Sequence, residues 1–439
     1  MKRLLVRSPK DPFEVVSPRQ AYHRNLIGDN AGNLVFLQAT HRILRTSDQV
    51  CEPGGFSVDP PLARTVNETF DAYVMPLANA FRAQYEPKLK RMIRFLERLT
   101  IPVVILGVGA QSDPDLGFER LKPMEPSIRR FMTAALDRGP VVGVRGEMTA
   151  EYLFGLGFRD VEVIGCPSMF LHGDRIEVTK RVAALDRNAR VSINISPYVA
   201  AMGPISVRHA ARYPNLVYVP QDLETLGALI RGGGWSSSLP PDDPVPLHSA
   251  HPLFAGRRAR FHVEPWPWID DLATRDFSFG TRIHGNIAAI LAGTPAYVFA
   301  HDSRTLELAR YFEIPHRLMR DVPPDIDAAD LHAEADYTAL TTNHARRFAV
   351  FAAYLARHGL RHVWLDGEDP AAFMDRVRAT RYPAAVTVPD AMLRPRSVAG
   401  RAFRARHAAT VAGWQAADWV MGQLWRARRL VRRVRRRLV

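Results

Sequence analysis

One short segment of the sequence combines an arginine and a histidine where a ligand site is favoured. The segment Asp276–Pro295 reads DFSFGTRIHGNIAAILAGTP; its apolar start predicts a strand that ends at Gly280, and the residues after His284 predict a helix. Ligands bind at the carboxyl ends of strands in open α/β sheets, and a helix N-terminus attracts anions. Arg282 would grip a carboxylate or phosphate, and His284 would supply a proton near neutral pH. Thr281 shares the turn and is a binding candidate. The alternative is an ion-paired Arg282 and a His284 that only caps the helix.

Arg145 occupies a similar position earlier in the chain. A predicted strand, Val141–Val144, ends immediately before it, and a predicted helix, Glu147–Leu156, follows. This arginine would either face a crevice or lie on the surface and pair with an acidic residue of the helix. Cys166 follows another predicted strand. Because the sequence offers it no evident histidine partner, we expect a small buried packing residue rather than a nucleophile.

The segment Asn25–Phe36, NLIGDNAGNLVF, is rich in glycine and in short polar side chains. Its glycines allow the backbone to approach a ligand closely. Three side chains at the start of the following helix would hydrogen-bond a substrate, cap the helix, or do both: Asp29, Asn30 and Asn33.

The elements that would position these residues are short runs rich in Val and Ile, alternating with helical patterns. This order is typical of parallel sheets covered by helices on both faces, so the sequence predicts an α/β fold. The predicted strands are Ala72–Met75, Pro102–Leu106, Val141–Val144, Val161–Ile164, Val191–Ile195, Leu216–Val219, Arg260–Val263, Phe277–Gly280 and Ala296–Phe299. The predicted helices are Glu86–Leu99, Pro126–Asp137, Glu147–Leu156, Asp222–Ile230, Ile269–Thr274, Gly285–Leu291 and Thr305–Tyr311. A polar segment that we expect to be helical, Thr179–Ala189, is the expected domain boundary.

The net charge of +14 is concentrated at one end of the 439-residue chain. Residues 401–439 hold eleven arginines against one acidic residue, Asp418. The rest of the chain is only weakly basic, which argues against a nucleic-acid groove, so no nucleic acid is expected as a partner. Apolar positions recur every three or four residues in this tail. That pattern predicts a basic amphipathic helix, which would contact an anionic membrane surface.

The remaining composition favours a cytoplasmic protein. Two cysteines, Cys51 and Cys166, fit a reducing compartment better than a disulfide framework. The first residues have neither the apolar run of a secretory signal nor that of an anchor, and no apolar run is long enough to span a bilayer. The sequence has no P-loop, no complete dinucleotide fingerprint and no zinc-type Cys/His spacing, so we expect no cofactor and no metal.

Taken together, these segments resemble the polysaccharide pyruvyl transferase family. The family's early N-x-GD-x-A element is matched by Asn25–Ala31. Its mid-chain arginine, followed by a helix that ends in L-x-x-LG, is matched by Arg145 and Leu153–Gly157. Its closing motif, G-x-R-x-H-x-x-I-x-A-x-x-x-G-x-P, is matched by Gly280–Pro295. The resemblance extends over residues 20–320 or so.

Three neighbouring segments depart from the family pattern. Ala300–Leu308 is similar to the family's Y-D-x-K segment, with His301 and Arg304 substituted. The family's Asp-Pro-Ala after the mid-chain strand is Cys166-Pro167-Ser168 here, and its Gly-rich turn is Met75–Asn79. These changes bear on the acceptor and the finer geometry more than on the donor.

The resemblance implies two Rossmann-like domains that face a cleft, as in GT-B glycosyltransferases. It also implies transfer of the enolpyruvyl-derived unit of phosphoenolpyruvate to a sugar of a polysaccharide or lipid-linked glycan, as a pyruvate ketal. Arg145 and Arg282 would then hold the negative charges of the donor, and His284 would protonate its methylene carbon. Asp222 would hydrogen-bond or deprotonate a sugar hydroxyl, or else serve as the N-cap of the helix that it begins.

The expected domains are a Rossmann-like one over residues 1–180 and a second over 190–325 that carries the donor-binding motif. A helical extension over 326–385 and the basic tail over 386–439 follow. Two other functions remain open. A GT-B nucleotide-sugar glycosyltransferase would use the same Arg–His pair on a diphosphate. A non-catalytic, membrane-docked assembly factor of a polysaccharide system would depend on the tail.

Overall fold

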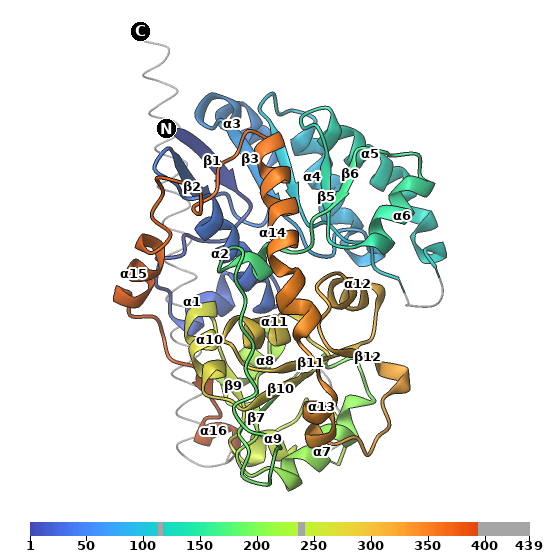
Figure 1. The fold of residues 1–439 in the computed structure, drawn as a ribbon, viewed down its shortest axis with the longest axis vertical. Coiled ribbons are helices and arrows are strands. Elements are labelled where there is room, and N and C mark those ends of the chain that lie inside the picture. Colours follow the sequence, from blue (N-terminus) through green and yellow to red (C-terminus); the bar gives the residue numbers. More distant parts are fainter. Residues whose placement is uncertain (113–116, 236–241, 394–439) are drawn as a thin grey trace.

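The computed structural model describes residues 1–112, 117–235 and 242–393. The predicted basic amphipathic helix lies outside these residues. Within them the chain forms two parallel β-sheets, one in each half of the molecule, with helices packed around both (Figure 1). The predicted α/β class is confirmed.

The N-terminal sheet has the strand order β2-β1-β3-β4, and its neighbouring strands are parallel. These strands are β1 (Lys2–Val6), β2 (Gln49–Pro53), β3 (Ala72–Pro76) and β4 (Val103–Leu106). A second parallel pair, β5 (Val142–Val144) and β6 (Val161–Val163), continues the layer through a bridge between Val108 and Val144. The flanking helices are α3 (Ala63–Thr69), α4 (Glu86–Leu96), α5 (Glu125–Leu136) and α6 (Glu147–Gly155). Both β3 and β4 are wholly buried, as expected for parallel strands covered on both faces.

The C-terminal sheet has the order β12-β11-β10-β7-β8 and is also parallel. Its strands are β7 (Val191–Asn194), β8 (Val217–Tyr218), β10 (Phe277–Gly280), β11 (Ala296–Ala300) and β12 (His316–Leu318). The helices of this half are α7 (Met202–Arg212), α8 (Leu223–Arg231), α9 (Pro252–Ala255), α10 (Pro265–Ala273), α11 (Ile283–Leu291), α12 (Ser303–Tyr311) and α13 (Ala328–Glu334). A short antiparallel pair, β9 (Arg260–Phe261) and β13 (Val386–Thr387), lies at its edge.

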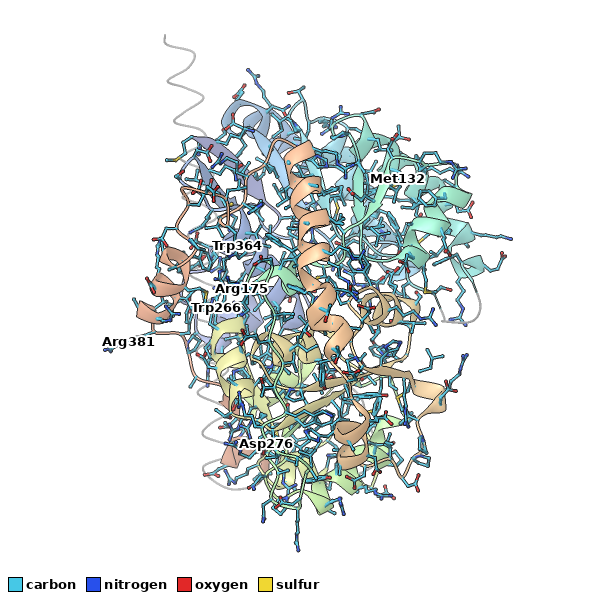
Figure 2. All side chains as sticks on the ribbon, viewed as in Figure 1. Met132, Arg175, Trp266, Asp276, Trp364 and Arg381 are labelled. Atoms are coloured by element: carbon cyan, nitrogen blue, oxygen red, sulfur yellow. The ribbon has the colours of Figure 1, made fainter. Side chains whose placement is uncertain are left out.

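Two buried helices join the halves. Every residue of α2 (Gly32–Leu44) except Asn33 is buried, and so is every residue of α11. A helix that is buried on all sides has no solvent face, which fits a position between two domains. One apolar cluster accordingly contains residues of both halves, including Trp266 of α10 (Figure 2). The two sheets are therefore held by a shared core as well as by the chain that links them.

The segments after β12 return along the molecule. The long helix α14 (Thr338–Arg357) runs from the C-terminal half to the N-terminal one (Figure 1). The hydroxyl of Tyr354 accepts a hydrogen bond from the Gly143 amide at 3.1 Å and donates one to the Ile105 carbonyl at 2.6 Å. It thus bridges the seam between β4 and β5. The helices α15 (Ala372–Ala379) and α16 (Asp390–Leu393) follow.

The structure also corrects some expected elements. The segment Thr179–Ala189 lies between β6 and β7 but contains no helix. Apart from Leu185 and Ala189 it has no buried side chain to hold a helical face, and a short helix without such packing is unstable in water. The expected helix Ile269–Thr274 begins earlier, because Pro265 occupies the first position of α10.

Candidate active site

The candidate residues are carried by turns at the carboxyl ends of the strands, where the two sheets approach each other. Gly280 ends β10 with a φ of 142°, and a Cβ at this position would lie 1.8 Å from the Asn194 carbonyl oxygen. Only glycine fits such a close approach. The turn then brings His284 into the first turn of α11, with Arg282 as the N-cap residue. The strand–helix junction expected from the sequence is therefore present.

His284 is almost enclosed, with 8% of its surface exposed. Its Nε2 lies 3.5 Å from the Cys166 thiol, and its ring packs on Phe36 with 5.3 Å between centroids. Burial, and then the charges of Arg145 and Arg304, hold the pKa of His284 well below its ordinary value. The imidazole is therefore neutral at physiological pH unless a negative charge comes to lie beside it.

Cys166 is the histidine's neighbour, although no histidine partner was evident from the sequence. The expected burial is present, with 1% of the residue exposed. Burial raises the pKa of its thiol, and the hydroxyl of Ser168 donates a hydrogen bond to Sγ at 3.0 Å. The thiol is therefore a neutral group beside Nε2, which leaves Nδ1 as the nitrogen free for another partner.

Arg145 lies in the interior and not on the surface. It has no exposed area; its guanidinium donates to the carbonyls of Gly107 and Leu77 at 3.2 Å, and its Nη1 has no partner among the described residues. Burial lowers the pKa of Arg145, whereas Cys166 and Glu307 act in the opposite direction. Contact with a substrate would require the side chains over Nη1 to move. As the structure stands, Arg145 is a buried positive charge next to His284.

Arg282 and Thr281 have different surroundings. The Nε of Arg282 donates to the Ile195 carbonyl at 3.3 Å, and its guanidinium lies 5.8 Å from the ring centre of Tyr198, which is largely exposed. Thr281 is buried, and its hydroxyl accepts a hydrogen bond from the Ser196 amide at 2.7 Å. Arg282 can therefore reach a ligand, whereas the hydroxyl of Thr281 already ties its turn to the end of β7.

A third arginine, which was not among the candidate site residues, joins the cluster after β11. Arg304 donates to Asp302 at 3.1 Å, and Asp302 also accepts from Gln111 of the other half at 3.1 Å. Burial would raise the pKa of Asp302, but Arg304, His301 and hydrogen bonds lower it to about 2. The carboxylate stays charged and holds Arg304 in place. The one sequence signal for Arg304 and Asp302 was the similarity of Ala300–Leu308 to the family's Y-D-x-K segment.

Glu307 is a further group that sequence reasoning missed. Its carboxylate accepts hydrogen bonds from the amide of Thr149 at 3.1 Å and from the hydroxyl of Thr149, and thereby ties α12 to α6 of the opposite half. Burial raises the pKa of Glu307 to about 7, against the influence of Arg145. A glutamate in an amphipathic helix carries no signal that would single it out in a sequence.

The segment around Asp29 contacts the C-terminal half on one side and lines a cavity on the other. Asn30 and Asp222 form a backbone bridge between the halves, and the Asn30 side chain accepts from the Gly32 amide at 2.8 Å. Asp222 caps α8, accepting from the Thr225 amide at 2.8 Å. Its N-cap role is therefore present, and a role in sugar binding stays a prediction.

Asp29 and Asn33 lie on the other side of this segment and line a cavity of about 130 Å³ in the N-terminal half. Asn33 donates to the carbonyls of Ile27 and Gly28 at 3.0 and 2.8 Å, which shapes the loop. Arg145, Arg282 and His284 do not line this cavity. The predicted site residues therefore fall into two adjacent groups, one around His284 and one around the cavity.

Solved structures align along most of the chain at low identity. A UDP-N-acetylglucosamine 2-epimerase is 12% identical, with 84% of this chain and 98% of that chain covered and a TM-score of 0.40. The glycosyltransferase SnogD from Streptomyces nogalater is 13% identical, with coverage of 87% and 99% and a TM-score of 0.34. UDP-GlcNAc 2-epimerase from Neisseria meningitidis bound to UDP-GlcNAc is 11% identical, with coverage of 86% and 100% and a TM-score of 0.33. Likeness at this level carries no argument about a substrate.

Sequence comparison is more specific. No curated protein matches the chain. A family model described as polysaccharide pyruvyl transferase matches residues 30–303, which is more than half of the chain and includes Arg145, Arg282 and His284. The chain is therefore a transferase that belongs to the polysaccharide pyruvyl transferase family.

Proposed function

We propose that this transferase moves the enolpyruvyl-derived unit of phosphoenolpyruvate onto a sugar of a polysaccharide or lipid-linked glycan, as a pyruvate ketal. The observation that carries the proposal is the position of His284 at the start of α11, beside the charges of the buried Arg145 and the partly buried Arg304. A small donor with several negative charges suits such a group of cations.

The proposed reaction needs one proton donor and no change of redox state. A sugar hydroxyl adds to C2 of the donor while the methylene carbon takes a proton from His284. A second hydroxyl then displaces phosphate from C2, so that two C–O bonds form and one C–O bond to phosphate breaks. One of the two hydroxyl protons restores His284, and the other leaves with the phosphate. The protein's contribution is to hold the donor's charges and to place the acid.

The low pKa of His284 is compatible with this role. Burial and then the arginine charges disfavour the imidazolium, and a bound donor anion between the arginines offsets the effect of their charges. The kcat profile reports the complex and the kcat/KM profile reports the free enzyme. We therefore expect the alkaline fall of kcat to lie at higher pH than that of kcat/KM for phosphoenolpyruvate.

The direct test combines ligand binding with product analysis. Phosphoenolpyruvate should raise the melting temperature of the protein, and UDP-glucose should not. With an acceptor glycan present, inorganic phosphate should be released and mass spectrometry should find a pyruvate ketal on the glycan. Stabilisation by UDP-glucose alone, with no phosphate release from phosphoenolpyruvate, would instead support a nucleotide-sugar glycosyltransferase.

Replacing Cys166 by aspartate should shift the pH dependence to higher pH. The substitution places a carboxylate next to His284 Nε2, and an opposite charge at that distance raises a histidine pKa by about 1 to 2 units. The alkaline limb of kcat/KM should move upward by a similar amount. Cys166→Ser, which keeps a small neutral group, is the matched control and should leave the limb in place. An unchanged profile in a folded Cys166→Asp protein would show that His284 does not deliver the proton.

We also propose peripheral contact with an anionic membrane through the tail, which would bring the crevice to a lipid-linked acceptor. Within the described ranges, no helix has an apolar stretch long enough to cross a bilayer. The proposal rests on the arginine run and on Trp414, Trp419 and Trp425 in the sequence. The full-length protein should float with anionic liposomes, and a protein truncated after Ala399 should not. Equal flotation of the full-length and the truncated protein would contradict the membrane proposal.

A further inference from the structure

The cavity in the N-terminal half has a charge that the proposed donor chemistry does not explain. Three cations line it, namely Arg7, Arg82 and Lys88, against a single carboxylate, that of Asp29. None of the charged residues described around His284 belongs to its lining. The excess of positive charge is therefore a property of this cavity itself.

The three cations gather around one aromatic side chain, Tyr85. Arg7 donates to the Tyr85 hydroxyl at 3.0 Å, the guanidinium of Arg82 lies 5.2 Å from the ring centre, and Lys88 Nζ lies 5.8 Å from it. Lys88 also pairs with Asp29 at 3.5 Å. The single carboxylate thus leaves Arg7 and Arg82 without a counter-charge in the cavity lining.

Part of this group has unused hydrogen-bonding capacity. Arg7 is buried, with 7% exposed, and its Nε has no hydrogen-bond partner among the described residues. Asn79 donates to Gln111, but its Oδ1 is likewise buried without a partner there. Buried polar groups are normally satisfied, so unpartnered ones beside a cavity indicate a ligand that supplies the missing bonds.

The cavity also adjoins the proposed donor site. Phe36 lines the cavity and packs on the ring of His284 at 5.3 Å. Leu77 lines it too, and its carbonyl accepts a hydrogen bond from Arg145 at 3.2 Å. Asn79 bonds to Gln111, which in turn donates to Asp302, the partner of Arg304. A molecule in the cavity is therefore one side chain away from His284.

We propose that this cavity binds the acceptor and selects acceptors that carry an anionic group. This inference rests on the proposed pyruvyl transfer. The rings of Phe56 and Tyr85 offer apolar faces for a sugar ring, Asn79 offers an amide to its hydroxyls, and Arg7 and Arg82 bind an oxyanion. A uronic-acid carboxylate and a glycosyl phosphate share this chemistry, and the experiment separates them.

The test measures equilibrium binding of three small probes by calorimetry, without phosphoenolpyruvate. The probes are methyl glucuronide, glucose 1-phosphate and neutral methyl glucoside. We expect at least one anionic probe to bind, and the double variant Arg82→Gln/Lys88→Gln to weaken that binding about tenfold or more, since the charge-assisted contact of Arg82 and the nearby charge of Lys88 are lost. The anionic probe that binds more tightly identifies the source of the oxyanion. Methyl glucoside should bind more weakly than either.

The matched control is Lys90→Gln/Arg91→Gln, which removes the same amount of charge from α4, the helix that carries Lys88. Lys90 pairs with Glu86 and Arg91 with Asp59, and neither lines the cavity. The control should bind the anionic probe within about twofold of the wild type. Melting temperatures of both double variants check that the protein stays folded.

Three results would overturn the inference. The first is neutral methyl glucoside binding as tightly as the anionic probes. The second is anionic binding that is the same in the cavity variant and the control. The third is phosphoenolpyruvate affinity that falls in the cavity variant but not in the control, because the cavity would then be the donor's site. Failure of phosphoenolpyruvate to bind would contradict the proposed function. Because the sugar probes are measured without phosphoenolpyruvate, their binding to the cavity can still be interpreted in that case.

Discussion

Replacement of His284 by asparagine should reduce turnover by about 10²- to 10⁴-fold, the usual contribution of a general acid, and leave phosphoenolpyruvate binding largely unchanged. Asparagine has a similar size and can still hydrogen-bond to the Cys166 thiol, 3.5 Å from the histidine Nε2, but it cannot deliver a proton. Steady-state kinetics gives the first quantity and calorimetry the second. A fall in kcat with an unchanged dissociation constant would separate the acid role from binding.

The control for this substitution is His316→Asn. His316 lies in β12, and its Nδ1 contacts the Ile314 carbonyl at 2.7 Å, away from the crevice. Its replacement should leave kcat within a few-fold of wild type. If His284→Asn retained similar activity, another group would have to protonate the donor, and the acid role assigned to His284 would be wrong.

Arg282→Lys and Arg145→Lys should each weaken phosphoenolpyruvate binding by about 10- to 100-fold although the charge is kept. A guanidinium presents several N–H groups in a fixed plane, whereas an ammonium is a point charge on a flexible stem. Arg145 already uses two nitrogens on the carbonyls of Gly107 and Leu77. Lysine cannot keep these contacts and also place a charge beside His284. The loss corresponds to about 1.4 to 2.8 kcal/mol of binding free energy.

Each of these variants has a matched control at the opposite, amino end of a strand. Arg190 precedes β7 and pairs with Asp276 at 2.9 Å, and Arg138 precedes β5 and donates to the carbonyl of Leu99. Arg190→Lys and Arg138→Lys should bind phosphoenolpyruvate normally. Melting temperatures identify any variant that is merely unfolded. Normal donor binding by both folded site variants would show that these arginines are structural and that the donor site lies elsewhere.

The local part of the candidate site could be predicted from the sequence, because its signals are local. Gly280, Arg282 and His284 occupy one strand–helix junction, and the period of the apolar residues on both sides places that junction correctly. The same holds for Arg145 between β5 and α6. Their family pattern is confirmed by the matching family model.

Contacts between the halves could not be predicted in this way. His284 and Cys166 are 118 residues apart, and Thr149 and Glu307 are 158 apart, so neither pair leaves a periodic trace in the sequence. The burial and the neighbouring charges that lower the pKa of His284 exist only after both sheets have been brought together. Sequence reasoning accordingly named the histidine and the arginine charge of Arg145 beside it, and missed the burial that lowers its pKa most.

Among the elements, β1 and most of α2 were not anticipated. β1 has the sequence KRLLV. Its first two residues are basic and exposed, so only the last three, which are apolar and buried, indicate a strand. In α2 nearly every position is buried, and a helix without a polar face shows no amphipathic period. Both elements are specified by tertiary packing, which single-sequence periodicity does not register.

The return of α14 to the first sheet has a consequence for how the protein is made. Tyr354 closes the seam between β4 and β5 from a position 211 residues after Gly143, so a ribosome must translate most of the chain before this seam can close. Until then the N-terminal half emerges with apolar surface that α14 will later cover, a stage at which nascent chains need protection from aggregation. Expression of residues 1–180 alone should therefore yield an insoluble fragment, and co-expression with a fragment that contains α14 should recover it.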